Sequence, residues 1–274
     1  MVKRLKVGIV GCGAIGSSLA KRIIKDFSQS IALVALYDSD AARSREVSRV
    51  VSPRKNLAVK NLAQAIQSSE LIIEAASAAS SWKIASSALR KGRRIMIMSV
   101  GGIVPHRKAL YALAKTHNAK VYIPSGAIAG IDALKASKFG TLKKVTLTTR
   151  KPPGSFKGVA FVEKKKIPLE ALTKDTVLFS GKASKAMRLF PQNINVAGVL
   201  SLAGCGQEKT EVRIIASPSL RKNTHEIEIQ SEAGSVWTRT ENTAHPDNPK
   251  TSYLAVLSAV ATLQQVVEPV EIGT

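Results

Sequence analysis

Three glycines near the N-terminus have the spacing of a phosphate-binding turn. Gly11, Gly13 and Gly16 lie in the string GCGAIG, directly after an apolar run at residues 5–10 and before a helical pattern. In such a turn the first glycine permits a tight bend, the second lets the backbone approach a pyrophosphate, and the third lets helix pack on strand. The helix N-terminus then faces the anion. The residues predicted to contact a dinucleotide here are Gly11, Cys12, Gly13, Ala14, Ile15 and Gly16.

A carboxylate stands where the ribose of such a dinucleotide would lie. Asp38 ends the second apolar run, at residues 31–37, and follows Gly16 by 22 residues. A carboxylate at this place accepts hydrogen bonds from the ribose diol and repels a 2′-phosphate, which favours NAD over NADP. Arg43 and Arg45 follow closely, and either could pair with a 2′-phosphate. NAD is therefore the expected cofactor, with NADP possible.

The elements around this turn alternate between strand and helix. Strands are expected at residues 5–10, 31–37, 70–75, 94–99 and 120–123, and helices at 14–25, 41–51, 62–68, 80–91 and 106–117. This alternation predicts an α/β fold with a doubly wound parallel sheet, a Rossmann dinucleotide-binding domain. Ala76, Ser77 and Ala78 follow the third strand, where a parallel sheet opens onto the cofactor crevice, and backbone contact with the cofactor is expected there.

The second half of the chain has a different pattern. Strands with period-two alternation are expected at residues 144–149, 212–216 and 225–230, and a polar stretch rich in lysine and proline covers 150–175. An α+β domain for substrate binding and dimerisation is the simplest account. The uncharged helical pattern at 252–267 needs cover and is expected to return to the first domain. The predicted domains are therefore 1–124 plus 249–274, and 125–248.

The charge balance is strongly basic. The 274 residues include 41 Lys and Arg against 19 Asp and Glu, a formal net charge of +22. Such an excess suggests nucleic acid, a membrane surface or acidic small molecules as partners. Aromatic residues make up only 4%, which leaves few platforms for stacked bases, and the basic residues are spread along the chain. Nucleic acid is thus an unlikely partner, and most of the excess is assigned to a solvated surface.

Cysteine content and hydropathy restrict the class of protein further. Cys12 and Cys205 cannot form a disulfide framework or a four-ligand zinc site, so a reduced compartment and no metal are expected. Both are interpreted as small packed residues. No apolar run reaches the roughly 18 residues of a membrane helix. We expect a soluble, cytoplasmic protein without membrane contact.

Several segments occur together in an order that is specific to one family. They are SGAIAGIDAL at residues 125–134, FPQNINVA at 190–197, NTHEI at 223–227, NPKTS at 248–252 and EIGT at 271–274. Together with the N-terminal glycine turn, they resemble the L-aspartate dehydrogenase family over essentially the whole chain. The resemblance implies oxidation of L-aspartate by NAD or NADP to iminoaspartate, which hydrolyses to oxaloacetate and ammonia or supplies NAD biosynthesis.

The resemblance also assigns roles to particular residues. It implies that His225 is the active-site histidine and that Ala129 and Asn195 contact the cofactor near its nicotinamide end. Hydride leaves the α-carbon of an amino acid only once its nitrogen has begun to lose a proton, and a histidine suits that proton transfer. By sequence alone a lone strand histidine such as His225, which begins an alternating strand at an element edge, is more often structural; the family resemblance reverses this interpretation. His106, His117 and His245 are expected at the surface.

The remaining predictions concern the substrate. A dicarboxylate needs cations or oriented donors, and Lys250, Thr251 and Ser252 are expected to supply them together with His225. The alternative is that residues 248–252 form a loop in which Ser252 or Thr251 caps the final helix, a role that is compatible with substrate binding. Asn195 could fix the nicotinamide carboxamide, or be a turn residue like Asn193.

Two other functions stay open at this point. One is a related two-domain reductase of another amino acid or carbonyl, such as a relative of homoserine dehydrogenase or dihydrodipicolinate reductase. The other is a redox-sensing regulator that binds nucleic acid through its basic surface. The second domain could also offer a dimer surface, and a homodimer is expected.

Overall fold

The computed structural model describes residues 3–190, 194–246 and 248–273, apart from the side chains of Ile194, Pro249 and Lys250. The chain divides into two compact units. The first unit comprises Met1–Pro124 and Val256–Ile272, and the second comprises Ser125–Ala255 and Gly273–Thr274. The chain thus re-enters the first unit at Val256, later than the expected residue 249, because the intervening residues form a strand and the start of a helix.

The first unit is built on a parallel sheet. Its strand order is β2-β1-β3-β4-β5, and the strands are β1 (Leu5–Val10), β2 (Ile31–Tyr37), β3 (Leu71–Glu74), β4 (Arg94–Ile97) and β5 (Val121–Tyr122). Every pairing is parallel. The chain leaves β1 towards β2 and then crosses to the other side at β3, so the order reverses between β1 and β3. Ligands of such sheets bind at this reversal, outside the carboxyl ends of the strands.

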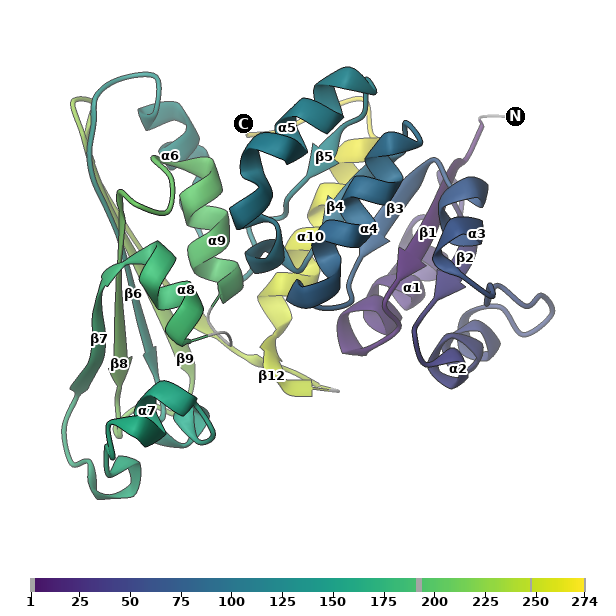
Figure 1. The fold of residues 1–274 in the computed structure, drawn as a ribbon. Helices are drawn as coiled ribbons and strands as arrows, with labels where there is room; N and C mark the ends of the chain where they lie inside the picture. Colours follow the sequence, from purple (N-terminus) through teal and green to yellow (C-terminus); the bar gives the residue numbers. More distant parts are fainter. Residues whose placement is uncertain (1–2, 191–193, 247, 274) are drawn as a thin grey trace. The chain divides into compact units, whose positions relative to one another are not determined.

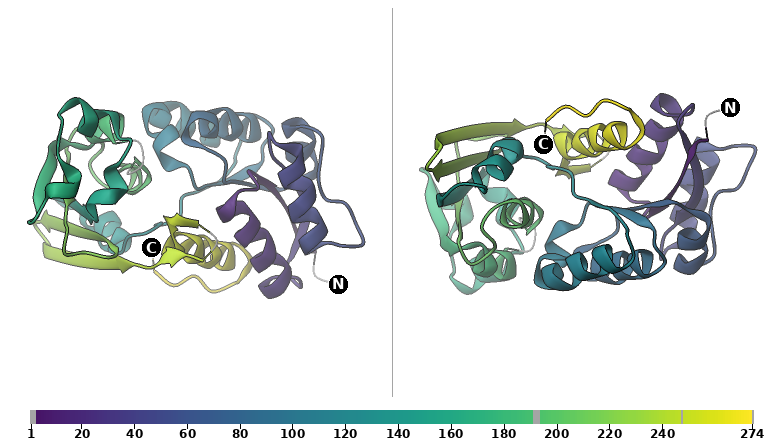
Figure 2. Two further views of the ribbon diagram at one scale, coloured as in Figure 1. Left: turned by 90° about the horizontal axis from the view of Figure 1, so that it is seen from below. Right: turned by 90° about the horizontal axis from the view of Figure 1, so that it is seen from above.

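Helices cover both faces of this sheet, which explains why its central strands are apolar on both sides. Figure 1 and Figure 2 show α1 (Ala14–Asp26), α2 (Ala41–Val51) and α10 (Tyr253–Val267) on one face. The other face carries α3 (Leu62–Ser68), α4 (Ala78–Arg90) and α5 (Arg107–Thr116). Two short 3-10 turns, Val100–Gly102 and Val104–His106, precede α5. The predicted doubly wound α/β fold is confirmed.

The C-terminal helix belongs to the core of the first unit. Val256, Ala259 and Leu263 of α10 are buried in the same cluster as Val7 of β1 and Leu19 of α1. The spacing of three and four residues places these α10 side chains on one stripe. The first unit thus covers this stripe of the uncharged helix, whereas Tyr253 and Leu254 at the start of α10 stay exposed.

The second unit is built on a mixed sheet. Its strand order is β10-β9-β6-β8-β7, and the strands are β6 (Leu142–Lys151), β7 (Thr176–Lys182), β8 (Thr210–Ala216), β9 (Asn223–Ser231) and β10 (Gly234–Asn242). Only β6 and β8 pair in parallel; the other neighbours are antiparallel. A separate small hairpin joins β11 (Ala244–His245) to β12 (Asn248–Ser252). Strands β7 and β10 were not expected from the sequence.

One face of this second sheet is covered by helices and the other is open. The helices are α6 (Ile131–Ser137), α8 (Ala183–Leu189) and α9 (Ile194–Ala203), with α8 and α9 packed on the sheet (Figure 1). Because side chains alternate along a strand, Val145, Leu147 and Thr149 of β6 share the covered face, whereas Thr146 and Thr148 face outwards. The predicted polar stretch at 150–175 contains η3 (Pro153–Phe156), α7 (Ala160–Lys164) and η4 (Leu169–Ala171).

Among the helices that the structure describes, none has both the length and the apolar content to cross a membrane.

Candidate functional site

The glycine turn has a geometry that leaves room for an anion. Gly11 has φ +100°, and a Cβ there would lie 2.4 Å from the carbonyl oxygen of Ala75. A Cβ at Gly16 would lie 1.8 Å from the carbonyl oxygen of Gly11. A Cβ at Gly13, in contrast, would meet nothing within 4 Å, just before α1 begins at Ala14. The first and third glycines are therefore needed for packing, while the second borders open space at a helix N-terminus, as phosphate binding requires.

Asp38 holds the glycine turn against the end of β2. Its Oδ2 accepts a hydrogen bond of 2.7 Å from the backbone N–H of Cys12, and its Oδ1 accepts one of 2.9 Å from the N–H of Asp40. An ionised carboxylate has about four lone-pair positions, so both oxygens can still accept from a ribose diol. Arg43, one of the two candidates for binding a 2′-phosphate, pairs with Asp40 at 3.4 Å.

Cys12 is buried within this turn. Burial, reinforced by the negative charge of Asp38, raises the pKa of its thiol to about 12. The thiol is thus protonated at neutral pH. It is a poor nucleophile in this form, because the reactive form of a cysteine is the thiolate. This agrees with the interpretation of Cys12 as a small packed residue whose backbone faces the cofactor.

Glu74 is a site residue that the sequence did not reveal. It is fully buried at the end of β3, where its two oxygens accept hydrogen bonds of 2.9 Å from the N–H groups of Ala76 and Ser99. Burial raises the pKa of Glu74, an effect that these hydrogen bonds oppose. Glu74 therefore ties together the loops that follow β3 and β4, and Ala76 and Ser77 are exposed on the first of these. The one signal in the sequence that could have pointed to Glu74 was its place as a glutamate at the end of an otherwise apolar strand.

His225 lies inside the second sheet. It is the third residue of β9, opposite Thr149 of β6 and Thr240 of β10, and only 6% of its surface is exposed. Its Nδ1 is 3.0 Å from the hydroxyl oxygen of Thr149. The expected alternating strand is present, but it begins two residues earlier, at Asn223, and His225 lies inside the sheet because β10, which was not foreseen, pairs with β9 on the side away from β6.

The surroundings of His225 keep its imidazole neutral. Burial lowers the pKa of His225 to about 3, and the nearby positive charge of Lys151 acts in the same direction. If Nδ1–H donates to Thr149, Nε2 keeps a lone pair and can accept a proton. The arrangement is thus that of an unprotonated imidazole whose ring is oriented by one hydroxyl group.

The loop at residues 125–130 is fastened to β10, the strand next to that of His225. The carbonyl oxygen of Ala127 accepts hydrogen bonds from the hydroxyl of Thr240 (2.9 Å) and the side-chain amide of Asn242 (3.1 Å). The carbonyl oxygen of Ala129 accepts one from Thr238 (3.2 Å). Ala129, predicted to contact the cofactor, is exposed. These side chains of β10 fix its position relative to the sheet.

Residues 248–252 form strand β12 and not the alternative loop, and Ser252 directly precedes the last helix, α10. The Ser252 hydroxyl donates a hydrogen bond of 2.6 Å to Oδ1 of Asn242, and the amide of Asn248 donates one of 3.2 Å to the Thr251 hydroxyl. Asn242 thereby connects the loop of Ala127 with the predicted substrate segment. The side chain of Lys250, predicted to bind substrate, lies outside what the structure describes.

Two further predicted positions have mixed outcomes. His245 is buried in β11 with its ring 5.6 Å from that of Tyr253, so its expected place at the surface is wrong. The hairpin of β11 and β12 brings it inwards. Asn195 is exposed in the first turn of α9, one of the helices on the covered face of the sheet. Asn193 lies outside the described residues.

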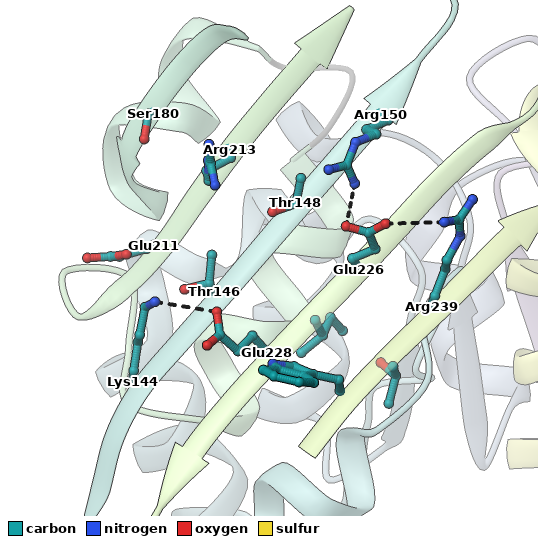
Figure 3. Close-up of a pocket in the computed structure, with 13 residues that line it drawn as sticks. Lys144, Thr146, Thr148, Arg150, Ser180, Glu211, Arg213, Glu226, Glu228 and Arg239 are labelled. Carbon is teal, nitrogen blue, oxygen red and sulfur yellow. Dashed lines mark hydrogen bonds and ion pairs between the residues drawn. The ribbon is translucent and has the colours of Figure 1, made fainter. Parts of the chain in front are cut away.

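A cavity of about 650 Å³ lies on the open face of the second sheet (Figure 3). In Figure 3, Arg150 and Arg239 both pair with Glu226, and Lys144 pairs with Glu228 at 3.4 Å. His225 and Thr149 point to the opposite, covered face, because side chains alternate along the strands. This cavity is therefore distinct from the surroundings of His225. Within the described part of the chain, no group of His, Cys, Asp and Glu side chains could hold a metal ion.

Comparison with protein families assigns both halves of the chain. The model described as aspartate dehydrogenase, C-terminal, matches residues 132–266, and that described as homoserine dehydrogenase, NAD binding domain, matches residues 11–124. The second match confirms the dinucleotide-binding domain and NAD as its cofactor class. The two matches together cover the glycine turn, Asp38, Asn195 and His225.

Individual proteins resemble this chain over its full length. The L-aspartate dehydrogenases of Methanosarcina acetivorans and Methanosarcina barkeri are 46% and 44% identical to it over 272 residues, 98% of this chain and 100% of each relative. The crystal structure of aspartate dehydrogenase from Thermotoga maritima matches with a TM-score of 0.77 and 27% identity, covering 99% of this chain and 100% of that one.

Proposed function

The chain belongs to the L-aspartate dehydrogenase family, and we propose that it oxidises L-aspartate to iminoaspartate with NAD as the electron acceptor. It is an oxidoreductase with an NAD-binding domain. The observation in the structure that best supports the specific reaction is the buried, neutral His225 held by Thr149. Iminoaspartate hydrolyses to oxaloacetate and ammonia or is passed on to NAD biosynthesis.

His225 is the proposed proton acceptor. The α-ammonium of aspartate must lose one proton before its nitrogen can share a lone pair with the α-carbon as hydride leaves. Nε2 of His225 accepts this proton when Nδ1–H donates to Thr149. An anionic substrate beside the imidazole raises the pKa of His225 and so makes it a stronger base in the complex than in the free enzyme.

The cofactor is held by backbone groups of the first unit. Bound NAD supplies the hydride acceptor for this reaction. The N-terminus of α1 and the open side of Gly13 bind the pyrophosphate, and Asp38 accepts from the ribose diol. Ala76, Ser77, Ala129 and Asn195 are proposed further contacts. Asp38 supports NAD over NADP, and we expect kcat/KM to be higher with NAD because the carboxylate repels a 2′-phosphate.

An amino-acid panel with each nicotinamide cofactor tests this function. We expect reduction of NAD with L-aspartate and far less with L-glutamate, L-alanine or L-homoserine, followed by fluorescence or absorbance of NADH. Absence of aspartate-dependent NADH formation would overturn the proposal. Turnover of L-homoserine would instead favour the related two-domain reductase, against which the match over residues 132–266 argues. Salt-sensitive DNA binding without any amino-acid turnover would favour a regulator.

A homodimer through the open face of the second sheet is part of the proposal. This face carries cations and carboxylates together and exposes 74% of Trp237. A surface with both charge signs can pair with a second copy of itself across a two-fold axis. Light scattering should give twice the mass of one chain, and Trp237→Glu should lower it. A wild-type mass of one chain would contradict this assembly.

We also place the enzyme in the cytoplasm. Cys12 and Cys205 are both free, as expected of a chain in a reducing compartment. Fractionation of the source cells, with the chain detected by antibody, tests this; recovery with the membrane or external fraction would contradict it.

A further inference from the structure

Lys151 is the last residue of β6 and shares a sheet face with the candidate base. Thr149 of β6 pairs directly with His225 of β9, and Lys151 follows two positions later on the same face. Its own partner in β8 is Ala216, which brings no charge. Its charge is close enough to His225 to lower the pKa of the imidazole. The covered face of the sheet therefore presents a cation, a hydroxyl group and a neutral imidazole from two adjacent strands.

This lysine differs from the other cations of the sheet, because Lys143 and Arg213 are exposed and the remaining ones pair with carboxylates. Lys144, Arg150, Lys182 and Arg239 each lie within 4.0 Å of a carboxylate. No carboxylate of the described residues pairs with Lys151, which is partly buried. Burial lowers its pKa to about 8. Taking a cation out of water without a counter-ion is unfavourable. A position that holds such a partly buried, unpaired cation is therefore suited to binding an anion from outside the chain.

We propose that Lys151 binds a carboxylate of the dicarboxylate substrate. The proposal rests on the function proposed above and adds a recognition residue to it, one that no sequence motif indicated. A carboxylate on the Lys151 ammonium forms a charge-assisted hydrogen bond and neutralises the buried charge. The same contact places the substrate beside the imidazole that is to accept its proton. Lys151 is thus a specificity-determining cation, in addition to the predicted role of Lys250.

The test compares Lys151→Met with the wild-type enzyme in two assays. One is the KM for L-aspartate, and the other is competitive inhibition by succinate, a dicarboxylate that lacks the ammonium group. Loss of a hydrogen bond to a charged group should raise both constants about 10- to 100-fold. Lys151→Arg keeps the positive charge, so both of its constants should lie between those of the wild type and those of Lys151→Met. Lys143→Met, at an exposed position near the other end of the same strand, should leave both unchanged.

Thermal unfolding separates this role from a structural one. Since the unliganded enzyme buries Lys151 without a counter-ion, Lys151→Met should be at least as stable as the wild type while binding succinate more weakly. Unchanged constants for Lys151→Met in an enzyme that oxidises aspartate would overturn this proposal and leave the proposed function standing. If the wild type does not oxidise aspartate, the proposed function fails, and direct calorimetric titration with succinate still decides whether Lys151 binds a dicarboxylate.

Discussion

The cofactor turn of the first unit and the His225 site of the second are built in different ways. Most contacts of the turn join residues that are near in sequence, such as Cys12 and Asp38, which are 26 positions apart, although Gly11 packs against the more distant Ala75. The groups involved are mainly backbone N–H groups and glycines. The His225 site joins side chains that are far apart, with 76 positions between Thr149 and His225 and 115 between Ala127 and Asn242.

This difference has consequences for substitutions. A backbone site tolerates changes of side-chain chemistry but not added volume where chain segments touch. A site of side chains on adjacent strands tolerates small changes of volume but depends on each polar group. The following predictions test that contrast, beginning with the largest effect.

Gly16→Ala should abolish NADH binding and strongly destabilise the first unit, because its Cβ would lie 1.8 Å from a backbone oxygen. Gly13→Ala is the matched control, since its Cβ meets nothing within 4 Å and its φ of −72° suits alanine. It should fold normally but bind NADH about tenfold or more weakly, as its methyl group takes the space of the phosphate. Fluorescence titration measures the NADH affinity of each variant, and thermal unfolding measures its stability. Equal stability of the two variants would contradict this account of the turn.

His225→Ala should lower kcat about 10²- to 10⁴-fold, the usual contribution of a positioned base, and leave the Kd for NADH unchanged. Thr149→Val should have a smaller effect in the same direction because the imidazole loses its orienting partner. Thr148→Val, on the open face of the same strand, serves as the control. Steady-state kinetics measure all three. Normal turnover by His225→Ala would remove the assignment of His225 as base.

Acidification should destabilise the second unit through His225. Its pKa is about 3 when folded and near 6.5 when unfolded, so between these values the unfolded chain binds more protons. The free energy of unfolding therefore falls as pH falls from about 6.5 towards 3, by about 1.4 kcal/mol per unit of pKa difference at most. Urea unfolding at pH 7 and pH 4, with Trp237 as reporter in a Trp82→Phe background, measures this. A His225→Gln variant with the same pH dependence would show that other groups are responsible.

Ser252→Ala should have the smallest effect, a loss of about 1 kcal/mol of unfolding free energy for one hydrogen bond to Asn242. Urea unfolding measures this loss, and Thr262→Ser, on the C-terminal helix, is a control that keeps its hydroxyl group. If Ser252 also binds substrate, as its sequence position predicts, the KM for aspartate rises as well. An unchanged KM would limit Ser252 to fastening β12 to β10.

The sequence predicted the first unit more completely than the second. Each parallel strand of the first unit is a short apolar run between helices, so periodicity located it. β10 was missed because its alternation, Val236-Trp237-Thr238-Arg239-Thr240, places polar groups on both faces of an edge strand. His245 was misplaced for a related reason: its burial depends on the hairpin with β12, which has no period of its own.

By itself the sequence determined the doubly wound fold, the glycine turn with Asp38 and the family to which the chain belongs. These depend on local spacing, on the stereochemistry of glycine and on ordered motifs, all of which are visible along one chain. Only the tertiary structure revealed that Glu74 links two loops, that Thr149 orients His225, and that Lys151 is buried near that imidazole without a carboxylate partner among the described residues. Strand register decides such contacts, and register is set by the packing of the whole sheet.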